Sequence, residues 1–321
     1  MPQTQAPSPH NAAVQDRVFQ EGRLSLGLTL PMLQSGQVVA DFREQVALAK
    51  LADALGFRAL WVRDVPLNSA DYPDPVGHLD PWVFLGALAS QTERIALVSG
   101  AIVLTLRHPL HVAKGAISVS ALSQGRFVLG LGSGDRPAEY AAFGQATAAR
   151  RDLYLRHWET VAAAVGAPSR VIPDQVHDDT PEFFLLPRLP AAIPLLAVGS
   201  GGQSVDWIAR HAIGWMTYHR EPAVQRERYR MWRTAVERAA PGQFRAFGVA
   251  MQLDLSADAG EPPTAISLGY RTGRNGLREL LRDMRGSGTH HVSLNLQASE
   301  RAPREVIEEL AAEVLPAFHA D

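Results

Sequence analysis

A repeated strand–helix unit constrains the fold of this chain more than any other feature of the sequence. Short apolar runs alternate with helical patterns, and three of the runs, at 58–62, 94–98 and 126–130, begin with arginine directly after a helix end. Alternating strands and helices require a parallel sheet. Parallel strands are buried on both faces and read as continuous apolar runs, as these do.

Eight such runs are expected to form strands, at 24–31, 58–66, 94–104, 126–134, 193–202, 214–219, 244–255 and 290–297. Each is followed by a helical stretch. This number of units in 321 residues predicts an α/β protein of the (β/α)8 TIM-barrel class. A doubly wound sheet would have five or six strands, with its glycine fingerprint after the first. A segment at about 168–190, rich in Pro, Asp and His, interrupts the alternation and is interpreted as an insertion.

Capping residues support the expected helix boundaries. Asp41 precedes one helical stretch, and Gly56 stands where a left-handed residue ends it. Asp80 precedes the next stretch, with Pro81 at its first position.

The composition narrows the class of protein. The net charge is −2 and cysteine is absent, so nucleic-acid binding, thiolate metal sites and a cysteine nucleophile are not expected. No apolar run is long enough to span a membrane, and residues 1–22 lack the apolar core of a signal peptide. We expect a cytoplasmic protein with a loose N-terminal arm at 1–22 and a single domain at 23–321.

The fourth expected strand ends in alternating glycines. Gly130, Gly132 and Gly134 are followed by Asp135, where a dinucleotide fingerprint would need its third glycine, and Pro137 follows two residues later. In a barrel this strand end lies at the active-site face, where glycines allow a planar ligand to approach the backbone. The alternative is tight strand–helix packing without a ligand.

The segments HP, AK, LSxGR and LGxGxG occur in this order between His108 and Gly134. With "LLAVGSGGQSVDWIARHAIGWM", they resemble the luciferase-like flavin-dependent monooxygenases, from about Leu24 to Pro316. "LWVRDVP", "SGDRP" and "LGYRTGRNGL" resemble a subgroup of luciferase-type oxidoreductases whose substrates are not established. The resemblance implies a bacterial-luciferase-like barrel that binds reduced FMN at its carboxyl-terminal face and forms a homodimer.

The resemblance implies a phosphate site in the loop after the fifth strand. Backbone N–H groups at a helix start suit a phosphate. By analogy the FMN phosphate would be held by Gly199, Ser200, Gly201, Gly202, Gln203 and Ser204. The alternative is a flexible glycine turn with Ser204 as a helix cap.

The resemblance also implies a cis peptide at Gly100–Ala101, beneath the isoalloxazine ring, although the same residues suit an ordinary interior strand. Some relatives have a phosphate-binding arginine near Ser133, which lies beside Gly132. In this chain Arg136 or Arg107 is then a candidate for that charge.

Side chains at other strand ends are candidates for substrate binding or catalysis. Light-emitting relatives have a catalytic histidine near Val65, so light emission is not expected. The candidates for catalysis are Asp64 and His219, and those for binding a substrate or anion include Arg63, Tyr218, Arg271 and Arg274. For Arg63 and Asp64 the alternative is a buried ion pair, and for His219 it is a lone histidine at a strand end. For Arg271 and Arg274 the alternative is a solvated helix start. No catalytic acid or base is assigned.

No metal site is expected. His290 and His291 are adjacent on an expected strand, so their side chains point to opposite faces and cannot bind the same ion.

The sequence therefore predicts an FMN-dependent oxidoreductase, in particular a monooxygenase that uses reduced FMN and O2 on a small organic molecule. A separate flavin reductase or NAD(P)H would supply the reduced flavin. The alternatives are a deazaflavin-dependent hydride-transfer enzyme and a flavin-binding relative without turnover.

Overall fold

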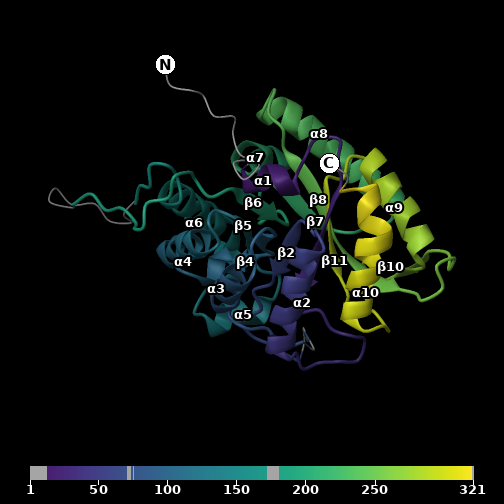
Figure 1. Cartoon of the computed structure of the whole chain (residues 1–321). Helices are drawn as coiled ribbons and strands as arrows, with labels where there is room; N and C mark the ends of the chain where they lie inside the picture. Colours follow the sequence, from purple (N-terminus) through teal and green to yellow (C-terminus); the bar gives the residue numbers. More distant parts are fainter. Residues whose placement is uncertain (1–12, 71–73, 75, 172–180, 320–321) are drawn as a thin grey trace, which may run out of the picture.

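The computed structural model describes residues 13–70, 74, 76–171 and 181–319 and shows a closed parallel barrel inside a ring of helices (Figure 1). Its eight strand positions run β1-β2-β3-β5-β6-β7-β8-β11, and β11 closes the ring by pairing with β1. The prediction of a TIM barrel is confirmed. The barrel strands are β1 (Ser25–Leu30), β2 (Ala59–Val62), β3 (Ala96–Ser99) with β4 (Ile102–Val103), β5 (Phe127–Gly132), β6 (Leu195–Val198), β7 (Gly214–Tyr218), β8 (Ala246–Leu255) and β11 (His291–Asn295).

Helices cover the outside of this ring, and α2 and α10 lie next to each other (Figure 1). The expected caps are present: Asp41 accepts hydrogen bonds from the N–H groups at the start of α2, and Asp80 does so for α3. The helices are α1 (Val14–Val18), α2 (Phe42–Ala54), α3 (Pro81–Gln91), α4 (Pro109–Leu122), α5 (Pro137–Ala142), α6 (Arg150–Ala164), α7 (Val205–His211), α8 (Pro222–Ala239), α9 (Arg274–Gly286) and α10 (Pro303–Glu309).

The barrel interior is a packed core. Along β1 the leucines at 26, 28 and 30 face the helices, because side chains of a strand alternate between its two faces. The inward side chains of the other strands form a second cluster, which contains Trp61, Val98, Val128, Leu196 and Met216. The ligand-binding surface must therefore be built from the loops at the strand ends.

The N-terminal segment differs from the expected loose arm. Residues 1–12 lie outside the described part of the chain, but residues 14–18 form α1, which contacts β3 and β5. Val14, Val18 and Phe19 are buried and join the interior cluster. Val14 and Val18 lie on one side of this five-residue helix, and Phe19 follows it in an extended conformation. The sequence therefore shows only a short apolar pattern within a segment rich in Pro and Gln. We call residues 13–22 the plug.

Two further expectations are corrected. The third expected strand is broken between Ser99 and Ile102, and a 3-10 turn at Leu104–Leu106 follows. The seventh expected strand, at 244–255, is followed first not by a helix but by a hairpin of β9 (Thr264–Ile266) and β10 (Gly269–Thr272), which extends the sheet beside β8. Helix α9 begins only at Arg274. Arg271 thus lies on a strand that is added outside the barrel ring.

The insertion expected at 168–190 is partly outside the described residues, which omit 172–180. Its described flanks contain no helix or strand. Among the described residues, no helix is both long enough and apolar enough to cross a membrane.

Candidate active site

The peptide between Gly100 and Ala101 is cis, at the position that the family resemblance implies. It lies on the indole of Trp61, because a Cβ at Gly100 would be 2.7 Å from Cε3 of that ring. On the neighbouring strand β5, a Cβ at Gly132 would lie 3.1 Å from the Cβ of Ala101. These small residues leave backbone, rather than side chains, at this part of the carboxyl-terminal end of the barrel.

The loop at 199–204 connects β6 to α7 through glycines that have left-handed backbone angles. Gly199, Gly201 and Gly202 have φ values of +73°, +58° and +77°, which residues with a Cβ seldom adopt. The N–H groups of Ser200, Gly201 and Ser204 have no acceptor within the described part of the chain. The loop therefore presents unpaired donors that suit an oxyanion.

The side chains of this loop mainly hold the loop itself. The Ser204 hydroxyl accepts from the N–H of Trp207 and caps α7. The buried Gln203 amide donates to the carbonyls of Arg151 and Gly201, at 3.0 and 3.3 Å. The amide of Gln203 is thus occupied, whereas the backbone N–H groups and the hydroxyls of Ser200 and Ser204, which only accept in these bonds, are available as donors.

Arg151 of α6 is a functional candidate that sequence reasoning missed. A Cβ at Gly202 would lie 3.5 Å from both the Cβ and the Cγ of Arg151. No hydrogen bond or ion pair of its guanidinium occurs among the described residues. An arginine without a carboxylate partner beside unpaired N–H groups favours an anionic ligand. Only the "RR" start of the helix at 150–151 hinted at this charge.

The carbonyl of Ser133, at the end of β5, is fixed by two hydroxyl groups. Thr105 donates to it at 2.7 Å, and the buried Tyr140 of α5 also donates to it. The backbone after Gly132 is thus held in place, although no charged group is added at Ser133.

Asp64 is held by Arg107 in a bidentate pair. Arg107 donates from Nε and Nη2 at 2.9 Å each, and the N–H of Val103 donates at 3.0 Å. Burial opposes the charge on Arg107, but the hydrogen bonds and charge of Asp64 outweigh it and raise the pKa of Arg107. Asp64 therefore links the end of β2 to β4, and its carboxylate has no free oxygen for proton transfer.

Arg63 and Arg136 meet on one buried carboxylate, that of Asp74. Their Nη2 atoms lie 2.7 and 3.1 Å from Oδ2 of Asp74, and Nε2 of His78 lies 3.7 Å away. Burial favours the neutral acid, but the His78 hydrogen bond and the charge of Arg63 hold the pKa of Asp74 well below its usual range. Both arginines are thus held by one carboxylate of the chain itself.

A cavity of about 350 Å³ lies beside the Asp64–Arg107 pair. Its size is at the lower end of the range for sites that bind small molecules. The cavity is lined by Asp64, Val65, Pro66, His78, Leu79, Asp80, Pro81, Leu106, Arg107 and Phe143. Its wall combines apolar side chains with the ion-paired side chains of Asp64, Asp80 and Arg107.

His219 and Tyr218 differ in their surroundings. Tyr218 is half exposed at the end of β7, whereas His219 is 6% exposed and packs edge-on against Tyr270 at 5.1 Å. Burial, together with Arg220, lowers the pKa of His219 to about 4. This environment disfavours a protonated His219 near neutral pH, so the candidate is not supported as a proton donor there.

The two C-terminal arginine candidates already have partners. Arg271 contacts the carboxylates of Asp254, Glu261 and Glu300. Arg274 pairs with Glu309 at 2.9 Å. We therefore do not retain them as anion-binding residues. Among the described residues there is also no group of three or more His, Asp or Glu side chains that could hold a metal ion.

The fold and this site define a (β/α)8-barrel protein with glycine-lined strand ends. In the described part of the chain, the loop after β6 also presents backbone N–H groups without an acceptor. The chain matches the family description "Luciferase-like monooxygenase" over residues 22–261. It therefore belongs to the luciferase-like monooxygenase family.

Two relatives from Mycobacterium tuberculosis match about half of this chain. An uncharacterized protein of Mycobacterium tuberculosis is 31% identical over 192 residues, which are 54% of this chain and 67% of the relative. The F420-dependent hydroxymycolic acid dehydrogenase of the same organism is 29% identical over 185 residues, 55% of this chain and 49% of the relative.

Solved structures share the fold over nearly the whole chain. The monooxygenase RslO1 of Streptomyces bottropensis has a TM-score of 0.73 at 22% identity, covering 92% of this chain and 99% of that one. The oxygenating constituent of 3,6-diketocamphane monooxygenase of Pseudomonas putida, in complex with FMN, has a TM-score of 0.67 at 15% identity, covering 92% and 98%.

Proposed function

We propose that this protein is a flavin-dependent monooxygenase that uses reduced FMN and O2 on a small organic substrate. The observation that carries the proposal is the pairing of two features: the open Gly100–Ala101 backbone beside Gly132, and the loop at 199–204 with its unpaired N–H groups. A flat ring needs the first feature and a terminal phosphate needs the second.

The residues present fit FMN. The N–H groups of Ser200, Gly201 and Ser204 are available to the phosphate oxygens, and Arg151 lies beside the loop to offset their charge. When bound, reduced flavin supplies the electrons for activation of O2.

The chain's own residues bind and shield the substrate. The cavity of about 350 Å³ beside Asp64 is the proposed substrate site. Leu79, Leu106 and Phe143 give it apolar contacts, while Arg107 is neutralised by Asp64 and Asp80. We therefore expect a substrate that has an apolar part and no negative charge, since Asp64 and Asp80 already offset the positive charge of Arg107.

A second candidate is hydride transfer to or from F420, a deazaflavin. The observation in its favour is the match to the F420-dependent dehydrogenase, although the matched segment spans only about half of that relative. The open backbone around Gly100–Ala101 suits a deazaflavin ring as well as a flavin ring.

Titration of the purified full-length chain with FMN and F420, followed by flavin fluorescence, separates these candidates. We expect saturable binding of reduced FMN and O2 consumption that depends on a flavin reductase and an added substrate without negative charge. Binding of F420 alone, with oxygen-independent turnover, would replace the first proposal with the second. If neither cofactor binds, both are wrong.

We also propose a homodimer formed through α3 and α4. Helix α3 contains no charged residue, yet its Val83 is 69% exposed, and Leu122 of α4 is 58% exposed. The two faces adjoin, because a Cβ at Gly86 would lie 3.9 Å from Cδ1 of Leu122. An uncharged helix face of this kind is typical of a surface that another subunit covers.

A further inference from the structure

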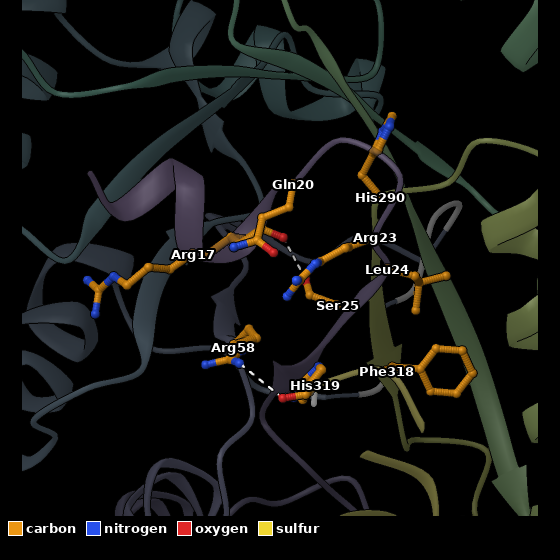
Figure 2. Close-up of a pocket in the computed structure, with 10 residues that line it drawn as sticks. Arg17, Gln20, Arg23, Leu24, Ser25, Arg58, His290, Phe318 and His319 are labelled. Atoms are coloured by element: carbon orange, nitrogen blue, oxygen red, sulfur yellow. Dashed lines mark hydrogen bonds between the residues drawn. The ribbon is translucent and has the colours of Figure 1, made fainter. Parts of the chain in front are cut away.

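A chain of hydrogen bonds crosses the barrel interior near the amino-terminal ends of β1 and β11. The indole N–H of Trp61 donates to Nε2 of His291 at 2.9 Å, and Nδ1 of His291 lies 2.6 Å from the hydroxyl of Ser25. The Ser25 hydroxyl lies 2.5 Å from the carbonyl oxygen of Val18 in the plug. Figure 2 shows this end of the barrel, with Ser25 and side chains of the plug around one small pocket.

The chemistry of the partners fixes the direction of every bond. An indole nitrogen only donates and a carbonyl oxygen only accepts, so His291 accepts at Nε2 and Ser25 donates to Val18. The remaining bond must then run from Nδ1–H of His291 to Ser25. His291 is therefore a neutral ring with one defined tautomer. Complete burial, together with His319, lowers the pKa of His291 to about 3, so the ring stays neutral near pH 7.

This series of hydrogen bonds reaches the proposed flavin site through Trp61. The indole is 3% exposed, and its Cε3 would be 2.7 Å from a Cβ at Gly100, so the ring supports the Gly100–Ala101 backbone from inside the barrel. His291 also packs on Gly27, whose absent Cβ would lie 3.0 Å from the imidazole. Rotation of the indole would break its bond to His291 and remove this support.

We propose that His291 is a positioning residue for the flavin site: it ties the Trp61 indole beneath Gly100–Ala101 to the N-terminal plug through Ser25. The plug thereby contributes to flavin binding from the opposite end of the barrel. This inference rests on the proposed function, since flavin contact with Gly100–Ala101 is part of it.

The test compares two serines that differ in their connection to Trp61. Ser25→Ala removes the acceptor of the His291 Nδ1–H group. Ser293→Ala is the matched control: Ser293 is 1% exposed in the same interior, and its hydroxyl pairs with Thr29 at 2.8 Å instead. Ser293 pairs in register with Gly27, two residues nearer the carboxyl-terminal end than Ser25, or about 6–7 Å. General loosening of the barrel should therefore affect flavin binding at least as much in the control.

The first readout needs no cofactor. The chain has six tryptophans, so the indole N–H signals in an NMR spectrum of the full chain are few, and Trp61→Phe assigns the one from Trp61. We expect Ser25→Ala to shift this signal and Ser293→Ala to leave it in place. Ser25→Thr, which keeps the hydroxyl, should restore the original position.

The second readout is the dissociation constant for FMN. We expect Ser25→Ala to raise it about 3- to 10-fold, the equilibrium effect of losing one buried hydrogen bond, and Ser293→Ala to change it less than 2-fold. Equal effects of both substitutions, or an unmoved Trp61 signal, would overturn the positioning role. If the unmodified protein binds neither FMN nor F420, the proposed function itself fails, which is a different result from normal binding by Ser25→Ala.

Discussion

The stem of Arg151 on α6 packs against Gly202 in the loop at 199–204, with its Cβ 3.5 Å from the position that a Cβ at Gly202 would occupy. This contact brings Arg151 to the N–H groups of Ser200 and Gly201, and neither the guanidinium nor these N–H groups have a partner among the residues that the structure describes. It connects two parts of the chain that are about fifty residues apart.

Arg151→Ala is expected to raise the dissociation constant for FMN by about 10- to 100-fold, as expected when a hydrogen bond to a charged group is lost. Fluorescence titration at low and high salt measures the change, and the salt dependence should weaken in the variant. Arg156→Ala, an exposed arginine further along α6, is the control. An equal loss of FMN affinity in both variants would mean that Arg151 does not contact the phosphate.

Asp64→Asn should lower the free energy of unfolding by about 3 kcal/mol, because it leaves the partly buried Arg107 without its bidentate partner. Urea unfolding measures this value. Asp80→Asn is the comparison, since Asp80 is more exposed and its bond to Arg107 is longer, at 3.2 Å. Its effect should stay below about 1 kcal/mol. Unchanged stability with complete loss of turnover in Asp64→Asn would instead indicate a catalytic carboxylate.

Gly130→Ala is expected to destabilise the barrel by about 3 kcal/mol or more, since the added methyl would lie 1.9 Å from the carbonyl oxygen of Ser99. The same change at Gly86 of α3 meets no atom closer than 3.9 Å and should stabilise its helix by about 0.5–1 kcal/mol. Chemical denaturation of both variants checks the pair. Similar stabilities would show that the close approach of β5 to Ser99 is absent in solution.

Buried histidines predict a loss of stability in weak acid. Burial is the main cause that lowers the pKa values of His219, His290 and His319 to about 4 and that of His291 to about 3. The unfolded chain takes up protons near pH 6.5, so stability is complete above that pH and falls as the pH drops toward 4. Each histidine contributes up to about 1.4 kcal/mol per pH unit.

Urea unfolding at several pH values between 7 and 5 measures this slope. His219→Phe should reduce the slope by the contribution of one histidine, whereas the exposed His111→Phe should not change it. A flat pH profile for the unmodified protein would mean that the four rings titrate alike in both states.

Val83→Arg should convert the proposed dimer to a monomer, because a charge would be buried within the α3–α4 face. Light scattering should give half the mass. Val224→Arg on α8 is the control, since Val224 is 49% exposed but lies on another side of the barrel. A monomer before any substitution would refute the proposed interface.

Local patterns in the sequence were sufficient to predict the barrel class of the fold. The alternation of apolar runs with helical patterns, and caps such as Asp41 and Asp80, depend on near neighbours in the chain and therefore appear in the sequence. The glycines at 199–202 and the Gly100–Ala101 pair were assigned to the site through the family resemblance, since the residues alone fitted a plain glycine turn and an ordinary strand as well. The plug was missed, since its helix has only five residues and just two of its buried apolar side chains, Val14 and Val18, lie on that helix.

The sequence did not reveal which charged and polar side chains pair with each other, because these pairs form only when the barrel closes. Arg63 and Arg136 come from different strand ends, and only the closed ring brings both to Asp74. Ser25 and His291 are neighbours because the first and last strands pair. The sequence by itself determined the eight repeated units and their glycine-lined ends, because those properties are local. The tertiary structure alone decided which arginines remain free and which side chains support the site, because these contacts join residues far apart in the chain.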